Sequence, residues 1–210
     1  MFEELTLWAN SLNHYRFNEI EKLKEVKNGI YLVFENGEQF LECQRIVRVG
    51  SHPSQDGFYR RLHQHFNKKQ RSSIMRKHFG RCFLNANNDT YLPVWNLSNS
   101  GVAKGTTGES LLNSAKEYKI ESEVSKYLKN LSIAVISNLN NQEERMELEK
   151  KLIATLSQDN SQYISDTWLG LNHPNHKIVS SGMWNVHHID GDKLITEKDF
   201  SLLKKTVDHG

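Results

Sequence analysis

Cysteine, proline and long apolar runs are all scarce in this sequence. Its 210 residues include two cysteines and three prolines. Two cysteines are too few for a disulfide framework or a cysteine-based zinc site, so we expect Cys43 and Cys82 to be free thiols. No apolar run is long enough to span a bilayer, and residues 1–17 resemble an acidic amphipathic helix rather than a signal peptide. We therefore expect a cytoplasmic protein without a membrane segment.

Net charge is also small, at +2, but the basic residues are unevenly distributed. Between Asp56 and Asp89 there is no acidic residue. Because lysine and arginine supply most of the sequence-independent affinity for nucleic acid, this interval predicts a nucleic-acid-binding surface. The alternative is a solvated basic face that acidic residues elsewhere balance. The residues we expect to contact nucleic acid are Lys68, Lys69, Arg71, Arg76, Lys77 and Arg81, together with His52.

Two short apolar segments indicate a β-hairpin. Residues 30–34 and 46–49 are β-branched, apolar or aromatic, as is typical of buried strands. Asn36 and Gly37 lie between them and tolerate the positive φ of a turn. The sequence predicts a hairpin whose loop is longer than two residues, since residues 38–44 belong either to the turn or to irregular strand ends.

The rest of the chain predicts helices around one further strand. Helical spacing of apolar residues covers residues 57–66, 72–84, 109–129 and 143–156, and further helices are expected within 3–25 and at 197–206. Leu131–Ser137 is the expected third strand, and residues 85–107 are expected to form a loop. The fold class is therefore α/β of the α+β type, with a small, mostly antiparallel three-stranded sheet flanked by helices. We expect a single domain over residues 1–210, with a core at 27–157 and an irregular C-terminal extension at 158–210 that packs on this core.

Glu149 occupies an unusual position for a carboxylate. At about 100° per residue it falls on the same helical face as Leu152, Ile153 and Leu156. A carboxylate among apolar residues is costly unless it is paired or binds a cation. The position therefore indicates a metal ligand, or alternatively a place at the rim of the apolar face or a structural ion pair, for instance with Arg145 one turn earlier.

Arg61 and His65 are four residues apart and project from one side of their predicted helix. This side is adjacent to the apolar stripe that contains Phe58 and Leu62. Both side chains can therefore face a substrate while the apolar residues anchor the helix. For His65, a capping or packing role is an equal alternative.

Several motifs resemble those of the GIY-YIG nuclease superfamily, in particular an uncharacterised bacterial branch. The signature begins with GIY at residues 29–31 and continues with RVG at residues 48–50, where Arg48 replaces the second tyrosine of the family. Further similar blocks are RLHQH at 61–65, LEKKLI at 148–153, WLG at 168–170 and SGMWN at 181–185. Their order and spacing together cover most of the chain.

The resemblance implies a one-metal DNA endonuclease with DNA as the partner. Glu149 would bind Mg²⁺ or Mn²⁺, Tyr31 would activate or position the attacking water, and Arg61 would stabilise the transition state. His65 would support one of these residues, and Arg48 would contact the scissile phosphate. The alternative is a nucleic-acid-binding protein that retains the fold without efficient chemistry, because Arg48 stands where the family has a catalytic tyrosine.

The C-terminal histidines suggest a different site, a zinc centre built from His173, His176, His187 and His188. Their spacing is poor for it, because Pro174 discourages a helix that presents two ligands and adjacent histidines point in opposite directions in an extended chain. Asn160 loosely matches an asparagine near the active site of some members of the superfamily.

Overall fold

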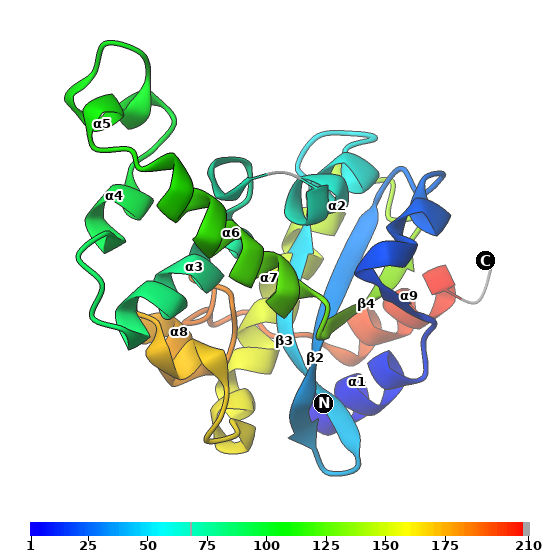
Figure 1. Cartoon of the computed structure of the whole chain (residues 1–210). Coiled ribbons are helices and arrows are strands. Elements are labelled where there is room, and N and C mark those ends of the chain that lie inside the picture. Colours follow the sequence, from blue (N-terminus) through cyan, green and yellow to red (C-terminus); the bar gives the residue numbers. More distant parts are fainter. Residues whose placement is uncertain (68, 208–210) are drawn as a thin grey trace.

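A four-stranded antiparallel sheet forms the centre of the computed structural model, which describes residues 1–67 and 69–207. The strands lie in the order β1, β4, β2, β3, of which β4, β2 and β3 are labelled in Figure 1. Their bounds are His14–Arg16 for β1, Gly29–Phe40 for β2, Cys43–Ser51 for β3 and Leu131–Ser137 for β4. The predicted fold class is confirmed, with one strand more than expected. The additional strand β1 interrupts the predicted N-terminal helix, because its residues pair with β4, for example Tyr15 with Ile133.

The predicted hairpin is formed by β2 and β3, but its turn is not at Asn36 and Gly37. The two strands remain paired as far as Phe40 opposite Cys43, so the turn is at Leu41 and Glu42, and Leu41 adopts a φ of 52°. Gly37, with a φ of 93°, lies instead where the register shifts between Phe34 and Gln39. A glycine with positive φ fits a β-bulge as well as a turn, which is why the local sequence misplaced the turn.

Helices cover both faces of the sheet. Alternation along β2 sends Ile30 and Leu32 to one face and Tyr31 and Val33 to the other. The first face packs against α1 (Phe2–Asn10), α7 (Gln142–Asp159) and α9 (Glu197–Val207). The second packs against α2 (Phe58–Asn67), α3 (Ile74–Ala86) and α6 (Ser114–Leu128).

The remaining elements are short. They are the 3-10 helices η1 (Phe17–Leu23), η2 (Gln70–Ser72), η3 (Ser100–Val102), η4 (Asn160–Tyr163) and η5 (Leu169–Asn172), and the helices α4 (Leu92–Asn96), α5 (Thr107–Ser110) and α8 (His176–Ser181). The segment expected to be a loop thus contains α4 and η3. Figure 1 shows α4 and α5 at the end of the molecule far from the sheet. In the part of the chain that the structure describes, we find no helix with both the length and the apolar character needed to cross a membrane.

Residues from the C-terminal segment cover the open edge of β3. Trp184 donates its backbone N–H to the carbonyl of Val47 at 2.7 Å. The side-chain amide of Asn185 accepts a hydrogen bond from the Val49 N–H at 3.0 Å and donates one to the Val49 carbonyl at 2.9 Å. An edge strand exposes unpaired backbone groups, and these bonds satisfy several of them. They also fix the segment around residue 185 beside β3.

Candidate active site

A cavity of about 380 Å³ opens beside β3, between α3, α7 and the C-terminal segment. Its wall is rich in basic side chains. The charged and imidazole residues that line it are Arg48, Arg61, Arg81, Glu149, His78, His187 and His188. A single carboxylate therefore faces three arginines. Such a wall favours an anionic ligand together with a cation at the carboxylate.

Arg48 extends from the middle of β3 into this wall. It lies opposite Val33 in the hairpin, so its side chain shares a face of the sheet with Tyr31. It is 7% exposed, and its Nη1 donates to the carbonyl of Trp184 at 2.5 Å. Its Nε is buried and finds no partner among the described residues. The guanidinium is thus held in place, with no acidic side chain of the described chain within ion-pair distance.

Arg61 reaches the cavity from α2. Phe58 and Leu62 on the same helix are almost completely buried against the sheet, which directs Arg61 to the side of the helix that borders the cavity. The guanidinium of Arg61 is half-buried, and no carboxylate of the residues that the structure describes lies within ion-pair distance of it. An unpaired, partly desolvated arginine is suited to binding an anion.

Glu149 enters the cavity from α7 and is half-buried. One carboxylate oxygen, Oε2, accepts a hydrogen bond from the hydroxyl of Ser51, the last residue of β3. Arg145 does not form the ion pair that the sequence left open. Its guanidinium donates instead to the carbonyls of Leu139 at 2.6 Å and His52 at 3.3 Å.

The second oxygen of Glu149 is therefore available to a ligand. Within residues 1–67 and 69–207 no hydrogen-bond donor engages Oε1, and no three histidine, cysteine or acidic side chains form a group that could enclose a metal ion. One carboxylate beside a polar cavity fits a hydrated Mg²⁺ or Mn²⁺ ion, because Mg²⁺ retains several waters and needs few protein ligands. The four C-terminal histidines do not form a zinc cluster among these residues.

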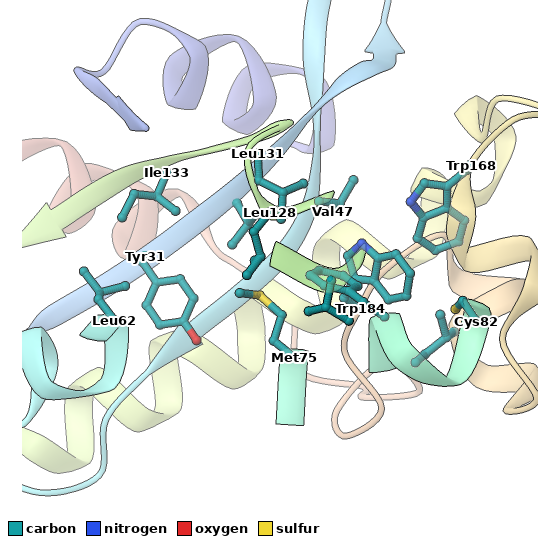
Figure 2. Close-up of a cluster of buried hydrophobic side chains, with 14 of the residues drawn as sticks. Tyr31, Val47, Leu62, Met75, Cys82, Leu128, Leu131, Ile133, Trp168 and Trp184 are labelled. Atoms are coloured by element: carbon teal, nitrogen blue, oxygen red, sulfur yellow. The ribbon is translucent and has the colours of Figure 1, made fainter. Parts of the chain in front are cut away.

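Tyr31 lies behind the cavity wall and is 1% exposed. Its Oη is 3.0 Å from Nε2 of His65, and Nδ1 of His65 is 2.7 Å from the hydroxyl of Ser73. Gly50 faces the ring from β3, and a Cβ there would lie 2.3 Å from the tyrosine hydroxyl. The absence of a side chain at residue 50 thus makes room for the phenol. Figure 2 shows the ring of Tyr31 between Leu62 and Met75, with its hydroxyl on the side of Met75.

His65 is completely buried, and this burial places its pKa well below the usual value of 6.5. Neighbouring positive charges on Arg61, Arg48 and Arg76 lower the pKa further. The ring is therefore neutral near pH 7 and carries one N–H. It donates through one nitrogen and accepts through the other, so it links the hydroxyls of Tyr31 and Ser73 without a net charge.

Four basic residues expected to bind nucleic acid form contacts within the protein. Arg76 is 3% exposed and its guanidinium is 2.6 Å from Oε2 of Glu121, while Arg71 is paired with Glu117, also at 2.6 Å. The remaining two contact backbone or amide oxygens near the end of α4. Lys77 donates to the carbonyls of residues 96 and 97, and Arg81 donates to Oδ1 of residue 96.

Of the remaining predicted contacts, only some can be placed. Lys69 is exposed, and Lys68 lies outside the described residues. His52 is half-buried outside the cavity wall, and its Nδ1 accepts the N–H of Ser54 at 3.0 Å. Asn160 is buried and donates to the carbonyl of Ile46 on the edge of β3 rather than lining the cavity.

The structure brings Arg48, Arg61 and Glu149 to one cavity, with the Tyr31–His65 pair behind it. A family model described as GIY-YIG domain matches residues 5–209 of the chain. The chain belongs to the GIY-YIG family. The GIY-YIG match extends through the C-terminal segment that covers β3, and membership indicates a nuclease-type function. No curated protein and no solved structure shows a significant match to the chain.

Sequence reasoning did not identify every residue of this GIY-YIG cavity. Asn175 and Asn185 line it, as does His78, which the helical pattern had placed only as an inward-facing position. His187 and His188 also both line the cavity, because His188 adopts a φ of 66° and the chain is not extended there. No local sequence pattern predicts that these residues line the cavity, since their positions depend on contacts between distant segments.

Proposed function

We propose that this protein is a divalent-metal-dependent endonuclease that hydrolyses phosphodiester bonds in DNA with a single metal ion. The observation that carries the proposal is the composition of one cavity wall, where the carboxylate of Glu149 lies with Arg48 and with the guanidinium of Arg61, which has no carboxylate partner in the described chain. A phosphodiester carries one negative charge at neutral pH and gains another in the transition state of hydrolysis. A wall with fixed positive charges and one cation ligand matches that demand.

Glu149 would hold the metal ion through Oε1, while Ser51 orients the carboxylate through Oε2. When bound, a hydrated Mg²⁺ or Mn²⁺ ion supplies Lewis-acid stabilisation of negative charge on phosphate oxygens. The hydrogen bond from Ser51 matters because a ligand with a fixed orientation loses less conformational entropy on binding.

Arg61 and Arg48 would bind the phosphate oxygens. Arg48 is held by the carbonyl of Trp184, and both arginines are partly buried. A guanidinium that is already in place and partly desolvated needs little reorganisation as charge builds up. In the hydrolytic step the oxygen of a water molecule forms a new bond to phosphorus and the bond from phosphorus to the leaving ester oxygen breaks. The water gives up one proton, and the leaving alkoxide takes up one.

Tyr31 would position the attacking water, and His65 would in turn hold the hydroxyl of Tyr31 in place. With its pKa lowered well below 6.5 by burial, His65 is a poor acceptor for a proton, so holding the phenol is the role that its chemistry supports. Ser73 completes the arrangement by contacting the second ring nitrogen.

Cleavage of supercoiled plasmid and of branched DNA with Mg²⁺ or Mn²⁺ tests this function. We expect nicking that stops when the metal is chelated and that is lost in Glu149→Gln. Glu147→Gln is the matched control, because Glu147 is on the same helix but its contacts are with Lys150 at 3.8 Å and Lys193 at 3.7 Å outside the cavity wall. Cleavage that survives Glu149→Gln at the wild-type rate contradicts the assignment.

Binding of DNA without cleavage is the second candidate. It is favoured by the nearly complete burial of Tyr31 and by the arginine at residue 48, where the family signature has a tyrosine. In that case the wild-type protein retards DNA in a binding assay but does not nick any single-stranded, double-stranded or branched substrate with either metal.

A further inference from the structure

The same cavity is also lined by Arg81 and His78 of α3, together with Asn175. We call these three residues the second end of the cavity, and Arg48, Arg61 and Glu149 the first end. Arg48 is close to residues of both groups, since its charge lowers the pKa of His65 and that of His78. The proposed reaction uses only the first end, so the second has no role in it.

Arg81 differs from Arg71 and Arg76 in having no acidic partner among the residues that the structure describes. Arg71 and Arg76 each form an ion pair with a glutamate. Arg81 is half-buried, and its contacts within the described chain are to neutral groups, namely Nε to Oδ1 of Asn96 at 2.7 Å and Nη1 to Nδ1 of His78 at 3.2 Å. A partly desolvated cation that is ordered by neutral groups is stabilised by an anion from outside the chain.

The geometry also fixes the protonation of the adjacent histidines. Nδ1 of His173 accepts the backbone N–H of Asn175 at 2.9 Å, so the proton of this neutral ring is on Nε2. Nε2 of His173 therefore donates to Nδ1 of His78 at 2.9 Å. Nη1 of Arg81 lies 3.2 Å from the same nitrogen and, because an arginine can only donate, it shares the single lone pair of that atom.

The proton of His78 is therefore on Nε2. His78 is 3% exposed and lines the cavity, and no acceptor for this N–H is found among residues 1–67 and 69–207. Burial lowers the pKa of His78 well below 6.5, so the ring stays neutral. The second end of the cavity thus presents one cationic donor group and one buried neutral donor whose direction is fixed by His173.

We propose that Arg81 and His78 form a second phosphate subsite, which binds a phosphodiester next to the scissile one on the same DNA strand. The proposal rests on the proposed function and extends it to substrate positioning. One guanidinium and one neutral imidazole N–H match the single negative charge of a diester. Ile74 and Val186, which also line the cavity, give the neighbouring sugar an apolar surface. Two adjacent phosphates held on either side of Arg48 would fix the register of the strand at the cut.

A set of oligonucleotides that carry one uncharged methylphosphonate each, placed in turn at the linkages around the cut, tests the subsite. For the wild-type protein we expect one linkage beside the scissile one where the substitution weakens binding by about 10-fold. Arg81→Gln should weaken binding of unmodified DNA by a similar factor and should lose the sensitivity at that linkage, because both changes remove the same contact. The salt dependence of binding should flatten by about 0.9 in log-log slope on duplex DNA.

Arg16→Gln is the matched control, since Arg16 is exposed on β1 at the opposite edge of the sheet and its loss changes the net charge equally. Its sensitivity to the methylphosphonate should equal that of the wild type. The proposal is overturned if Arg81→Gln keeps the wild-type sensitivity to methylphosphonate at every linkage. It is also overturned if Arg81→Gln binds more weakly than the wild type only to DNA that carries a terminal phosphate.

Failure of the subsite and failure of the proposed function give different results. Binding is measured with Ca²⁺ in place of Mg²⁺, so that the subsite is read without turnover. A protein that never cuts DNA but shows the linkage-specific effect at Arg81 retains the subsite and refutes the nuclease assignment. If the wild-type protein cuts DNA but Arg81→Gln binds every oligonucleotide as Arg16→Gln does, the nuclease function stands and the subsite is refuted. His173→Gln adds a test of positioning, because it removes the group that orients His78 while Arg81 remains. This variant should bind unmodified DNA more weakly, and its sensitivity to methylphosphonate should fall only at the linkage that Arg81→Gln affects.

Discussion

Oη of Tyr31 lies 3.0 Å from Nε2 of His65, and both side chains are buried. Tyr31 belongs to the first strand of the hairpin and His65 to the helix after it, so one short contact joins two motifs of the family signature. Because the imidazole is neutral, it can hold the phenol without placing another positive charge beside Arg48 and Arg61. His65→Gln preserves a polar side chain but not the ring geometry, and we expect it to lower the maximal rate more than it weakens DNA binding.

Glu149→Ala should abolish divalent-dependent cleavage, with a loss of at least about 100-fold, because the cation ligand is gone. The fold should persist, since the side chain is half-buried and its contact within the described chain is the Ser51 hydroxyl. Thermal unfolding checks the metal separately from catalysis. Mg²⁺ or Mn²⁺ should raise the Tm of the wild type and of Glu147→Gln but not of Glu149→Ala. An equal rise in all three proteins contradicts a metal site at Glu149.

Arg48→Ala should reduce cleavage by roughly 100-fold if the guanidinium contacts the phosphate. It should also lower the free energy of unfolding by about 1–3 kcal/mol, because the carbonyl of Trp184 loses its buried donor. Urea unfolding separates the two effects. Arg48→Lys retains the charge and should recover part of the rate, whereas Arg48→Tyr, the family residue, should be tolerated. Full activity in Arg48→Ala would show that Arg48 only supports the C-terminal segment.

Lys69→Gln and Arg71→Gln should behave differently although the two residues are close in the sequence. Lys69 is exposed, so its loss should flatten the salt dependence of DNA binding by about 0.9 in log-log slope on duplex DNA. Arg71 is paired with Glu117, so its loss should leave that slope unchanged and lower the stability instead. Equal slopes for Lys69→Gln and the wild type place the DNA surface away from η2.

Acid should destabilise the protein through its buried histidines. Burial lowers the pKa of His173 to about 4 and lowers those of His65 and His78 well below 6.5. Below pH 6.5 the unfolded chain binds protons that the folded chain does not, so stability falls as the pH decreases from about 6.5 toward the folded pKa. Each histidine contributes up to about 1.4 kcal/mol per pH unit in this window.

Urea unfolding between about pH 7.5 and about pH 5 measures this dependence. His173→Gln should reduce the slope of stability against pH below 6.5. The wild-type slope alone is not sufficient, because Glu35 changes the stability in the opposite direction. Burial raises the pKa of Glu35, whose carboxyl is held by Tyr127, Trp168 and Trp184. The folded state therefore gains stability from Glu35 on acidification, and only the difference between the wild type and His173→Gln isolates the histidine. An unchanged slope in His173→Gln contradicts a neutral, buried His173.

Local patterns in the sequence determined the elements that carry the family motifs. Leu131–Ser137 forms β4 as predicted, because a run of β-branched and apolar residues suits a buried strand. The periodicity around Glu149 correctly predicted a helix, and the lateral position of Arg61 beside Phe58 and Leu62 followed from the same 3.6-residue repeat. Such patterns depend only on neighbouring residues, so they can be read before the chain is folded.

Tertiary structure alone decided what surrounds these residues. Trp184 and Asn185 bind the edge of β3 from more than 130 residues away in sequence, and His78 meets His173 across a separation of 95 residues. The structure also determined that Arg71 and Arg76 are paired with glutamates of α6, whereas Arg81 contacts the neutral side chains of Asn96 and His78, although all three arginines belong to one basic segment. A local pattern gives the face on which a side chain lies but not its partner, because the partner is chosen by the packing of distant segments into one core.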